Sequence, residues 1–382
     1  MRYTQRLILF FFFIILISCQ SEDEKEKLID YSIKWNSETL TCIAEEGFYP
    51  RMHRINDNSL ILVYENGRGD VMLKRSLNEG SSWSEPNIIY ESFEFRDQDK
   101  STKINIANPE FIQLNNGDLL LACNLRPSKD GIYPFSIALK KSADNGDTWS
   151  QEQIVYEAST IFSDGCWEPS FLVLPDGTVQ LYFANEYPYN ESDEQEISML
   201  SSNDSGKTWS SEVTTVSFRK GHRDGMPVAV LDGDLIAVAI EDNVTGQFHP
   251  YIVRSKITDS WSKPITGASD NRHNALENPL QPEVYAGAPY FIKTDIGVYV
   301  LSYQTTNNRT SNWEKSTMEV VVSNTTDNFK NPSHPFNVPL GKEAKWNSIT
   351  DLGKGEIAAL SSTNFQSDRV GIWMIKGQIL KK

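Results

Sequence analysis

The chain has 382 residues and a formal net charge of −15, from 36 basic and 51 acidic side chains. This acidic balance disfavours nucleic acid and anionic lipid as partners, because both would repel a negative surface. The length exceeds the ~250–300 residues over which one hydrophobic core usually grows, which favours repeated units that each bury a small core.

The chain begins like a signal peptide. Arg2 and Arg6 precede the apolar run Leu7–Ile17, which is shorter than the ~20 residues of a membrane-spanning helix. The run ends in Leu-Ile-Ser-Cys at Cys19, which resembles the lipobox of bacterial lipoproteins. In that family the signal is cut before the cysteine, and the cysteine is lipidated. We therefore expect a lipoprotein signal peptide at residues 1–18 and a lipid on Cys19. The alternative is an ordinary signal peptide with an incidental cysteine.

A charged segment without apolar periodicity follows at Gln20–Lys27. We interpret residues 19–38 as a lipidated, flexible tether. An acidic run after the cysteine resembles the surface-export signal of Bacteroidota lipoproteins. This resemblance implies a lipoprotein of the outer membrane or cell surface, with the periplasmic side as the alternative. The lipid on Cys19 would be the chain's contact with the membrane.

The rest of the chain contains a repeat. Each copy has a proline, a short apolar strand, a turn with Asp-Gly or Asn-Gly, and a second apolar strand, a pattern typical of β-hairpins. The sixth copy lacks the proline and has Asn347 in its place. We call the proline of each copy, or Asn347 in the sixth, its anchor. Successive anchors are 58 to 62 residues apart, at positions 50, 109, 169, 227, 289 and 347. Units this small cannot bury a face alone, so neighbouring units must stack.

A second motif lies about 30 residues after the anchors, in the pattern Ser-x-Asp-x-Gly-x-Thr-Trp. Ser142–Trp149 and Ser202–Trp209 match it fully, Ser76–Trp83 has Asn in place of Asp, and degenerate copies occupy 255–261 and 323–329. We expect the Asp to cap its own turn, the Gly to supply a positive φ, and the Trp to pack between units. The motif resembles the Asp box of sialidases and related propellers, and it indicates fold rather than function.

Six stacked four-stranded units predict an all-β, six-bladed β-propeller of the sialidase-like type at residues 39–382. A strand near Leu40–Ala44 would complete the last blade beside Val370–Ile379 and close the ring. We expect a monomer.

The topology predicts where a site lies. In a propeller, the first strand of each blade starts at the face to which the second strand returns. The residues at those strand ends therefore converge. They are rich in carboxylates, arginines and aromatic side chains, which suit sugar binding. The candidate binding residues are Arg51, Asn108, Arg126, Trp167, Glu186, Arg223, Asp224, Asp242, Tyr303, Trp346 and Asn347.

These segments resemble the exo-arabinanases of glycoside hydrolase family 93. The resemblance covers most of residues 49–360 and is carried by 165–169, 223–227, 239–241 and 301–304. It implies an exo-acting glycoside hydrolase on an arabinan-like oligosaccharide or polysaccharide, with catalytic glutamates at Glu168 and Glu241. Retaining hydrolysis needs a nucleophile and an acid/base ~5–5.5 Å apart. Trp167 would desolvate Glu168 and suit it as the acid, with Glu241 as the nucleophile. Glu186 is a rival for either role.

Two alternatives stay open. An exo-sialidase would need three arginines that bind the carboxylate of its sugar, and Arg51, Arg126, Arg223, Arg272 and Arg309 could supply them. Tyr303 could be the tyrosine of the sialidase nucleophile pair. The first-blade Asp of sialidases is not evident, because Glu65 stands near its position. A non-catalytic glycan-binding lipoprotein would keep the aromatic and arginine residues without a close carboxylate pair. Because the five histidines are scattered, we expect neither a metal site nor a cofactor.

Overall fold

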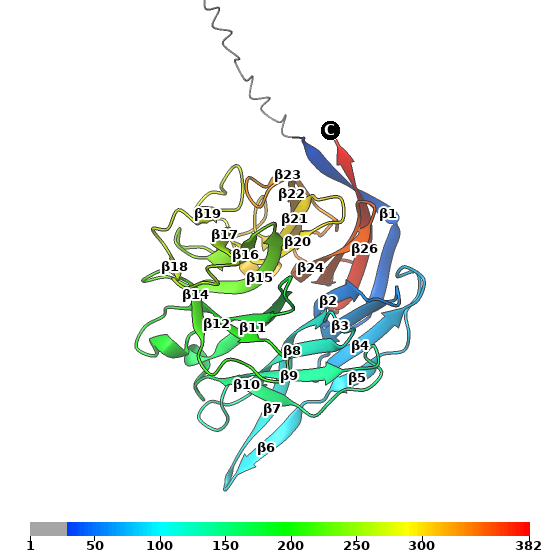
Figure 1. The fold of residues 1–382 in the computed structure, drawn as a ribbon. Coiled ribbons are helices and arrows are strands. Elements are labelled where there is room, and N and C mark those ends of the chain that lie inside the picture. Colours follow the sequence, from blue (N-terminus) through cyan, green and yellow to red (C-terminus); the bar gives the residue numbers. More distant parts are fainter. Residues whose placement is uncertain (1–28) are drawn as a thin grey trace, which may run out of the picture.

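A computed structural model describes residues 29–382, and the predicted signal peptide, Cys19 and most of the predicted tether lie outside these residues. Six sheets, antiparallel except for one short strand in the third, follow one another around a ring, so the predicted all-β, six-bladed propeller is confirmed (Figure 1). Neighbouring first strands contact each other all the way round, including those of blades 1 and 6. No helix in the described part of the chain is long and apolar enough to cross a bilayer.

The strands fall into blades in chain order. Blade 1 holds β2 (Phe48–Arg54), β3 (Leu60–Glu65), β4 (Val71–Ser76) and β5 (Asn87–Tyr90). Blade 2 holds β7 (Lys100–Gln113), β8 (Leu119–Pro127), β9 (Ser136–Ser142) and β10 (Gln153–Glu157), with β6 (Phe93–Asp97) as a fifth strand. Blade 3 holds β11 (Cys166–Val173), β12 (Val179–Asn185), β13 (Glu196–Ser202) and β14 (Thr214–Phe218), with β18 (Ile265–Thr266) parallel to β14.

The remaining blades complete the ring. Blade 4 holds β15 (Asp224–Asp232), β16 (Leu235–Asp242), β17 (His249–Lys256) and β19 (Arg272–Asn274). Blade 5 holds β20 (Ala286–Lys293), β21 (Tyr299–Thr305), β22 (Thr317–Ser323) and β23 (Lys330–Ser333). Blade 6 holds β24 (Ala344–Gly353), β25 (Glu356–Thr363), β26 (Gly371–Lys381) and the N-terminal β1 (Tyr31–Ala44). Three short 3-10 helices lie in loops, at η1 (Phe162–Asp164), η2 (Tyr187–Tyr189) and η3 (Trp313–Lys315).

Strand β1 closes the ring by pairing with β26, from Tyr31 opposite Lys381 to Ala44 opposite Ile372. The predicted pairing of Leu40–Ala44 with the last strand is present, and β1 begins earlier, at Tyr31, within the residues predicted as a tether. A register shift between Asn36 and Thr41 interrupts the strand, and most of its side chains stay partly exposed. That irregular edge strand lacks the clean apolar alternation by which a strand is recognised in a sequence.

The hydrophobic core is divided among the interfaces between blades. One buried cluster fills each of the six interfaces; for example, Ile61 and Leu73 of blade 1 pack with Leu119 and Leu121 of blade 2. Because each blade packs against a neighbour on both sides, a strand in the middle of a blade is buried on both faces. In β12, for example, all seven residues are buried. This division explains how a chain of this length avoids a single large core.

The Asp boxes form the turns after third strands, on the face opposite the first-strand starts. In the second-blade box, Asp144 Oδ1 accepts hydrogen bonds from Ser142 Oγ (2.8 Å) and from the Thr148 backbone N–H (2.9 Å). These bonds hold the pKa of the Asp144 carboxyl down at about 2. Gly146 has φ +93°, and Trp149 packs on the cluster between blades 1 and 2. The three expected roles are confirmed.

Candidate active site

A cavity of about 590 Å³ opens at the face where first strands begin and second strands end. Eight of the predicted site residues line it, so most of the predicted set does converge. They are Asn108, Arg126, Trp167, Glu168, Glu186, Arg223, Glu241 and Trp346. The cavity is also lined by Phe48, Tyr49, Glu65, Phe162, Gln195, Phe248 and Trp313, which were not among the predicted site residues.

A β-bulge at the start of every first strand shapes this cavity. In each blade the residue before the anchor has a left-handed backbone, and the register with the second strand shifts there. Left-handed geometry is costly for residues other than glycine, so its recurrence in all six blades marks a built feature of the ring. The six residues, with φ between +49° and +55°, are Tyr49, Asn108, Glu168, Met226, Ala288 and Trp346.

The bulged residues are tied to the preceding blade through their backbone N–H groups. Glu65 Oε1 accepts from Asn108 N at 2.6 Å, and Gln304 Oε1 accepts from Trp346 N at 2.8 Å. Glu241 Oε2 accepts from Ala288 N at 2.6 Å. The three side chains lie at the ends of β16, β3 and β21. Each is paired with the first-strand residue that directly precedes the bulged residue of its own blade. Glu241 therefore fixes the boundary between blades 4 and 5 as well as lining the cavity.

Two glycines make room for the Glu241 carboxylate. A methyl group on Gly225 would lie 2.9 Å from Oε1, and one on Gly287 would lie 2.5 Å from Oε2. Neither glycine has a positive φ, so the need for glycine is one of space. Burial raises the pKa of Glu241 to about 7, although the Ala288 N–H and Arg223 act in the opposite direction. The carboxylate is thus enclosed but still borders the cavity.

Glu168 lies on the bulge of β11, where its partly exposed side chain enters the same cavity. Burial raises its pKa to about 8, and the negative charges of Glu241 and Glu186 add to this effect. Arg126 and a hydrogen bond from the Met226 backbone oppose it. Two carboxyl groups that disfavour each other's ionisation form an acid and base pair, with the proton held more firmly by Glu168.

Glu186, the predicted rival, is held by other side chains. It forms an ion pair with Arg223, and Trp167 Nε1 donates to its Oε2 at 3.0 Å. Arg223 also reaches Asp193 at 2.7 Å. Burial raises the pKa of Glu186 and Arg223 lowers it. These contacts suit Glu186 to positioning Arg223 and Trp167, and they leave Glu168 and Glu241 as the unpaired carboxyl groups of blades 3 and 4 in the cavity.

Arg126 covers the wall between blades 2 and 3. Its guanidinium lies 5.2 Å from the ring centre of Phe162 and 5.3 Å from that of Trp167. Such contacts hold the planar group flat against the aromatic wall. No side chain or carbonyl among residues 29–382 accepts a hydrogen bond from it, so its donors are available to a ligand's oxygens.

Comparisons with known proteins agree with this architecture. A family model described as a BNR repeat-like domain matches residues 64–165. A search of curated proteins by sequence found no match. The GH93 alpha-L-arabinofuranosidase of Fusarium graminearum, solved with arabinobiose, has a TM-score of 0.65 at 15% identity, covering 90% of this chain and 97% of that one. The chain is thus a six-bladed β-propeller, and its residues 64–165 match the model of a BNR repeat-like domain.

Other propellers of known structure are similar. The Penicillium chrysogenum alpha-L-arabinanase complexed with arabinobiose gives a TM-score of 0.64 at 17% identity, over 89% of this chain and 98% of that chain. The NanB sialidase of Streptococcus pneumoniae gives 0.60 at 13% identity, over 91% and 70%. At these identities the likeness concerns the fold alone, so the chemistry must be argued from this propeller's own residues.

Three predicted site residues lie outside the cavity because neighbouring strand residues point to opposite faces. Glu241 faces the cavity, so Asp242 faces away and, with Asp224, forms a buried ion-pair cluster with Arg272. In the same way, Gln304 reaches the bulge of blade 6, whereas Tyr303 is buried and donates its hydroxyl to Glu319. Asp224, Asp242 and Tyr303 therefore do not line the cavity.

Arg51 and Asn347 do not line the cavity either. Arg51 lies beyond the bulge, within the propeller channel, where its Nε is 3.2 Å from Glu110 Oε2 and its guanidinium covers the Tyr49 ring. Asn347 is 1% exposed, and its amide finds no hydrogen-bond partner among the described residues. Both follow a bulged residue, Tyr49 or Trp346, and it is the bulged residue that lines the cavity.

The arginines do not form the triad that a sialidase would need. Arg126 and Arg223 line the cavity, but Arg51 is paired with Glu110 and Arg272 with Asp224 and Asp242. Arg309 donates to backbone carbonyls of Lys315, Val338, Pro339 and Lys342. Together with the burial of Tyr303, this arrangement disfavours a carboxylate-bearing sugar.

Metal-dependent chemistry has no visible ligand set here. Within residues 29–382, no group of three or more histidine, cysteine or acidic side chains is arranged to hold a metal ion.

Proposed function

We propose that the protein is a retaining glycoside hydrolase that acts on a neutral, arabinan-like glycan. The observation that carries this proposal is the pair Glu168 and Glu241 in one cavity, with the pKa raised to about 8 for Glu168 and about 7 for Glu241. Retaining hydrolysis needs such a pair, because one group must be protonated when the other is ionised. The folds shared with arabinan-degrading enzymes support the choice of sugar.

The two roles follow from the order of the pKa values. Glu168 retains its proton to higher pH and donates it to the glycosidic oxygen as that bond breaks. Glu241 attacks the anomeric carbon and forms a covalent glycosyl-enzyme. Glu168 then takes a proton from water, whose oxygen attacks the same carbon and releases Glu241. Arg126 and Arg223 are placed to bind sugar hydroxyl groups beside this pair.

We also propose exo action at an exported, lipid-anchored protein. Gln195 and Asp193, from the loop between β12 and β13, reach the cavity and Arg223. That loop thereby supports a wall on one side, as exo action requires. Attachment through Cys19 and location at the outer membrane or cell surface follow from the lipobox-like sequence. Metabolic labelling with a fatty-acid analogue, compared between the full chain and Cys19→Ala, tests the attachment.

The test of the chemistry is hydrolysis of a panel of aryl glycosides, linear arabino-oligosaccharides and a sialoside. The protein without its signal peptide is compared with Glu168→Gln and Glu241→Gln. Gln304 already holds the equivalent backbone bond in blade 5, so glutamine at position 241 keeps the structure and removes the charge. We expect each change to lower kcat on the cleaved glycan by about 10³-fold or more, at nearly unchanged Tm.

A non-catalytic glycan-binding protein is the second candidate, favoured by one specific observation. Glu241 makes the same backbone bond as Glu65 and Gln304, so a purely structural role would also explain it. Under this alternative the wild type cleaves nothing in the panel but retains a glycan, and both glutamine variants bind that glycan as tightly as the wild type. That result would remove the hydrolase proposal.

A further inference from the structure

The exposed aromatic side chains of the described chain are confined to the cavity face. Among residues 29–382, the aromatic side chains with large exposed areas are Phe162, Tyr187 and Trp313, at 49%, 48% and 45% of their surface. All three lie in loops on the side where first strands begin, and Phe162 and Trp313 line the cavity. Exposed aromatic surface is expensive to keep in water, so its concentration at one opening indicates a ligand.

The two cavity aromatics stand on opposite walls. Phe162 lies in η1, in the connection from blade 2 to blade 3, and Trp313 lies in η3 of blade 5. Blades 2 and 5 face each other across a six-membered ring whose first strands contact in chain order. Glu168 and Glu241 enter the cavity from blades 3 and 4, between these walls.

Both rings are held in place before any ligand binds. The Phe162 ring centre lies 4.9 Å from that of Trp167 and 5.8 Å from that of Phe135. The Trp313 ring is 6.1 Å from that of Tyr285, and Lys345 Nζ lies 5.0 Å from its centre. The Asn312 side chain caps η3 by accepting from Glu314 N at 3.0 Å. A platform fixed in this way loses little conformational entropy on binding.

We infer that Phe162 and Trp313 are two sugar-binding platforms on either side of the glutamate pair, and that the substrate is an oligosaccharide with sugar units on both sides of the bond that is cut. This inference rests on the proposed function. The apolar C–H faces of a pyranose or furanose ring pack on aromatic faces, while the hydroxyl groups at its edge meet the arginines. One platform would hold the departing part of the chain and the other the part that becomes attached to Glu241.

The experiment compares two substrates that differ in reach. Arabinotetraose can contact both platforms, whereas arabinofuranosyl fluoride has one sugar, which lies between the glutamates, and neither a second sugar nor a leaving group large enough to reach a platform. We expect Phe162→Ala and Trp313→Ala each to lower kcat/KM for arabinotetraose about three- to tenfold, the loss of one aromatic contact. The same variants should change kcat/KM for the fluoride by less than about twofold.

Tyr187→Ala is the matched control, because Tyr187 is equally exposed on the same face but does not line the cavity. It should leave both substrates within about twofold of the wild type. If both platform variants behave like this control, or lose the fluoride reaction as strongly as the tetraose reaction, the platform inference fails while the hydrolase stands.

Binding separates failure of the platforms from failure of the proposed function. If the wild type binds arabinotetraose in titration calorimetry without cleaving it, the hydrolase proposal fails, and the same three variants test the platforms through their Kd. A three- to tenfold weaker Kd in the two platform variants alone, by about the energy of one aromatic contact, would support the inference. A wild type that neither cleaves nor binds the tetraose overturns both proposals.

Discussion

At the scale of single residues, the order of two pKa values decides how the site would respond to pH. The pKa of Glu241 is raised to about 7 and that of Glu168 to about 8. The proposed mechanism needs Glu241 ionised and Glu168 protonated, so kcat/KM should rise as pH increases through about 7 and fall as it passes about 8. We expect a narrow, bell-shaped profile, measured on the glycan that the panel identifies.

The Glu168→Gln variant provides the control for this profile. With an activated leaving group that needs no acid, its residual activity should lose the alkaline limb and keep the acid limb. Because the two groups interact, the two limbs report the pair and not isolated side chains. A wild-type profile that stays flat through neutral pH would contradict the assignment of both roles.

Gly287, beside the proposed nucleophile Glu241, gives a second prediction at this scale. A Cβ at position 287 would lie 2.5 Å from both Glu241 Oε2 and Tyr285 Oη, so Gly287→Ala must displace the carboxylate. A shift of this kind commonly costs about 10²-fold in rate, and we expect that loss in kcat. The matched control is Gly341→Ala, where an added Cβ meets nothing within 4 Å. Equal kcat in the two variants would show that the position of Glu241 does not matter.

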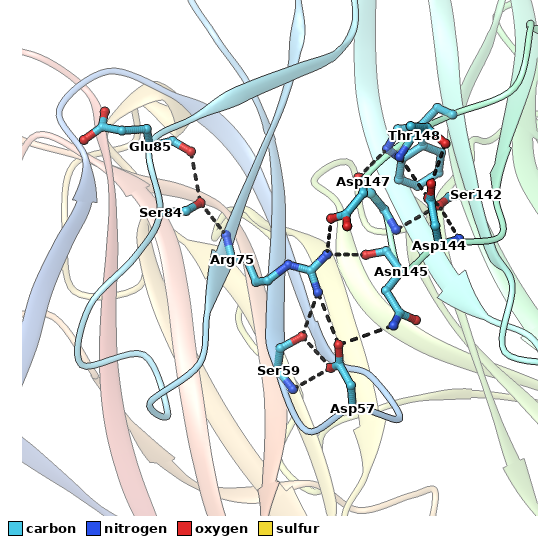
Figure 2. Close-up of polar contacts among 12 residues, drawn as sticks. Asp57, Ser59, Arg75, Ser84, Glu85, Ser142, Asp144, Asn145, Asp147 and Thr148 are labelled. Carbon is cyan, nitrogen blue, oxygen red and sulfur yellow. Dashed lines mark hydrogen bonds and ion pairs between the residues drawn. The ribbon is translucent and has the colours of Figure 1, made fainter.

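At the scale of elements, the blades are joined by polar contacts as well as by the apolar clusters. Figure 2 shows Arg75 of β4 reaching from blade 1 to the Asp box of blade 2. Its guanidinium donates to the Asn145 carbonyl at 2.5 Å and to Asp147 Oδ1 at 3.1 Å, and also to Ser59 and Asp57 of its own blade. The Asp-box turn is thereby an inter-blade connector.

Removal of that connector should weaken the ring without touching the site. The Arg75 side chain is 18% exposed, so its contacts are only partly screened by water. We expect Arg75→Met to lower the free energy of unfolding by about 1–3 kcal/mol in urea titrations. The control is Arg96→Met, since Arg96 is exposed and its side chain forms no hydrogen bond or ion pair among the described residues. A loss no greater than that of the control would show that the apolar cluster alone joins these blades.

The repeat could be predicted from the sequence, but the direction of each site side chain could not. The anchors at 50, 109, 169, 227, 289 and 347 mark the six bulges correctly, because turn and apolar patterns are local. Whether Glu241 or Asp242 enters the cavity depends on the register with which β16 pairs with the bulged β15, and the residue pattern of β16 does not state that register. Phe162 and Trp313 lie in loops of unequal length, outside the repeat that located the other residues.

At the scale of the whole molecule, one strand holds the ring closed. The N-terminal β1 is the outer strand of blade 6, whose other strands come from the C-terminus (Figure 1). Ile33, Trp35 and Leu40 of β1 pack against the cluster between blades 5 and 6. The two ends of the chain thus depend on each other, and every local opening of blade 6 must break contacts made by both.

Deletion of β1 should therefore destabilise the entire ring. A chain of residues 45–382 would expose the β26 edge to other molecules, and exposed edges associate. We expect aggregates in size-exclusion chromatography and a markedly lower Tm, compared with a chain of residues 29–382. A monomeric 45–382 chain with an unchanged Tm would show that the other strands of blade 6 suffice.

The direction of β1 also sets how the molecule would face a surface. Tyr31 pairs with Lys381 at the end of blade 6 far from the cavity, and β1 then runs toward the cavity face, where Ala44 pairs with Ile372. Both termini of the propeller thus leave from its underside. If the chain is attached to a surface through residues before Tyr31, the cavity faces away from that surface. Polymer chains in solution can then reach the cavity without being blocked by the surface. Immobilisation through either terminus should accordingly leave an insoluble polysaccharide free access to the glutamates.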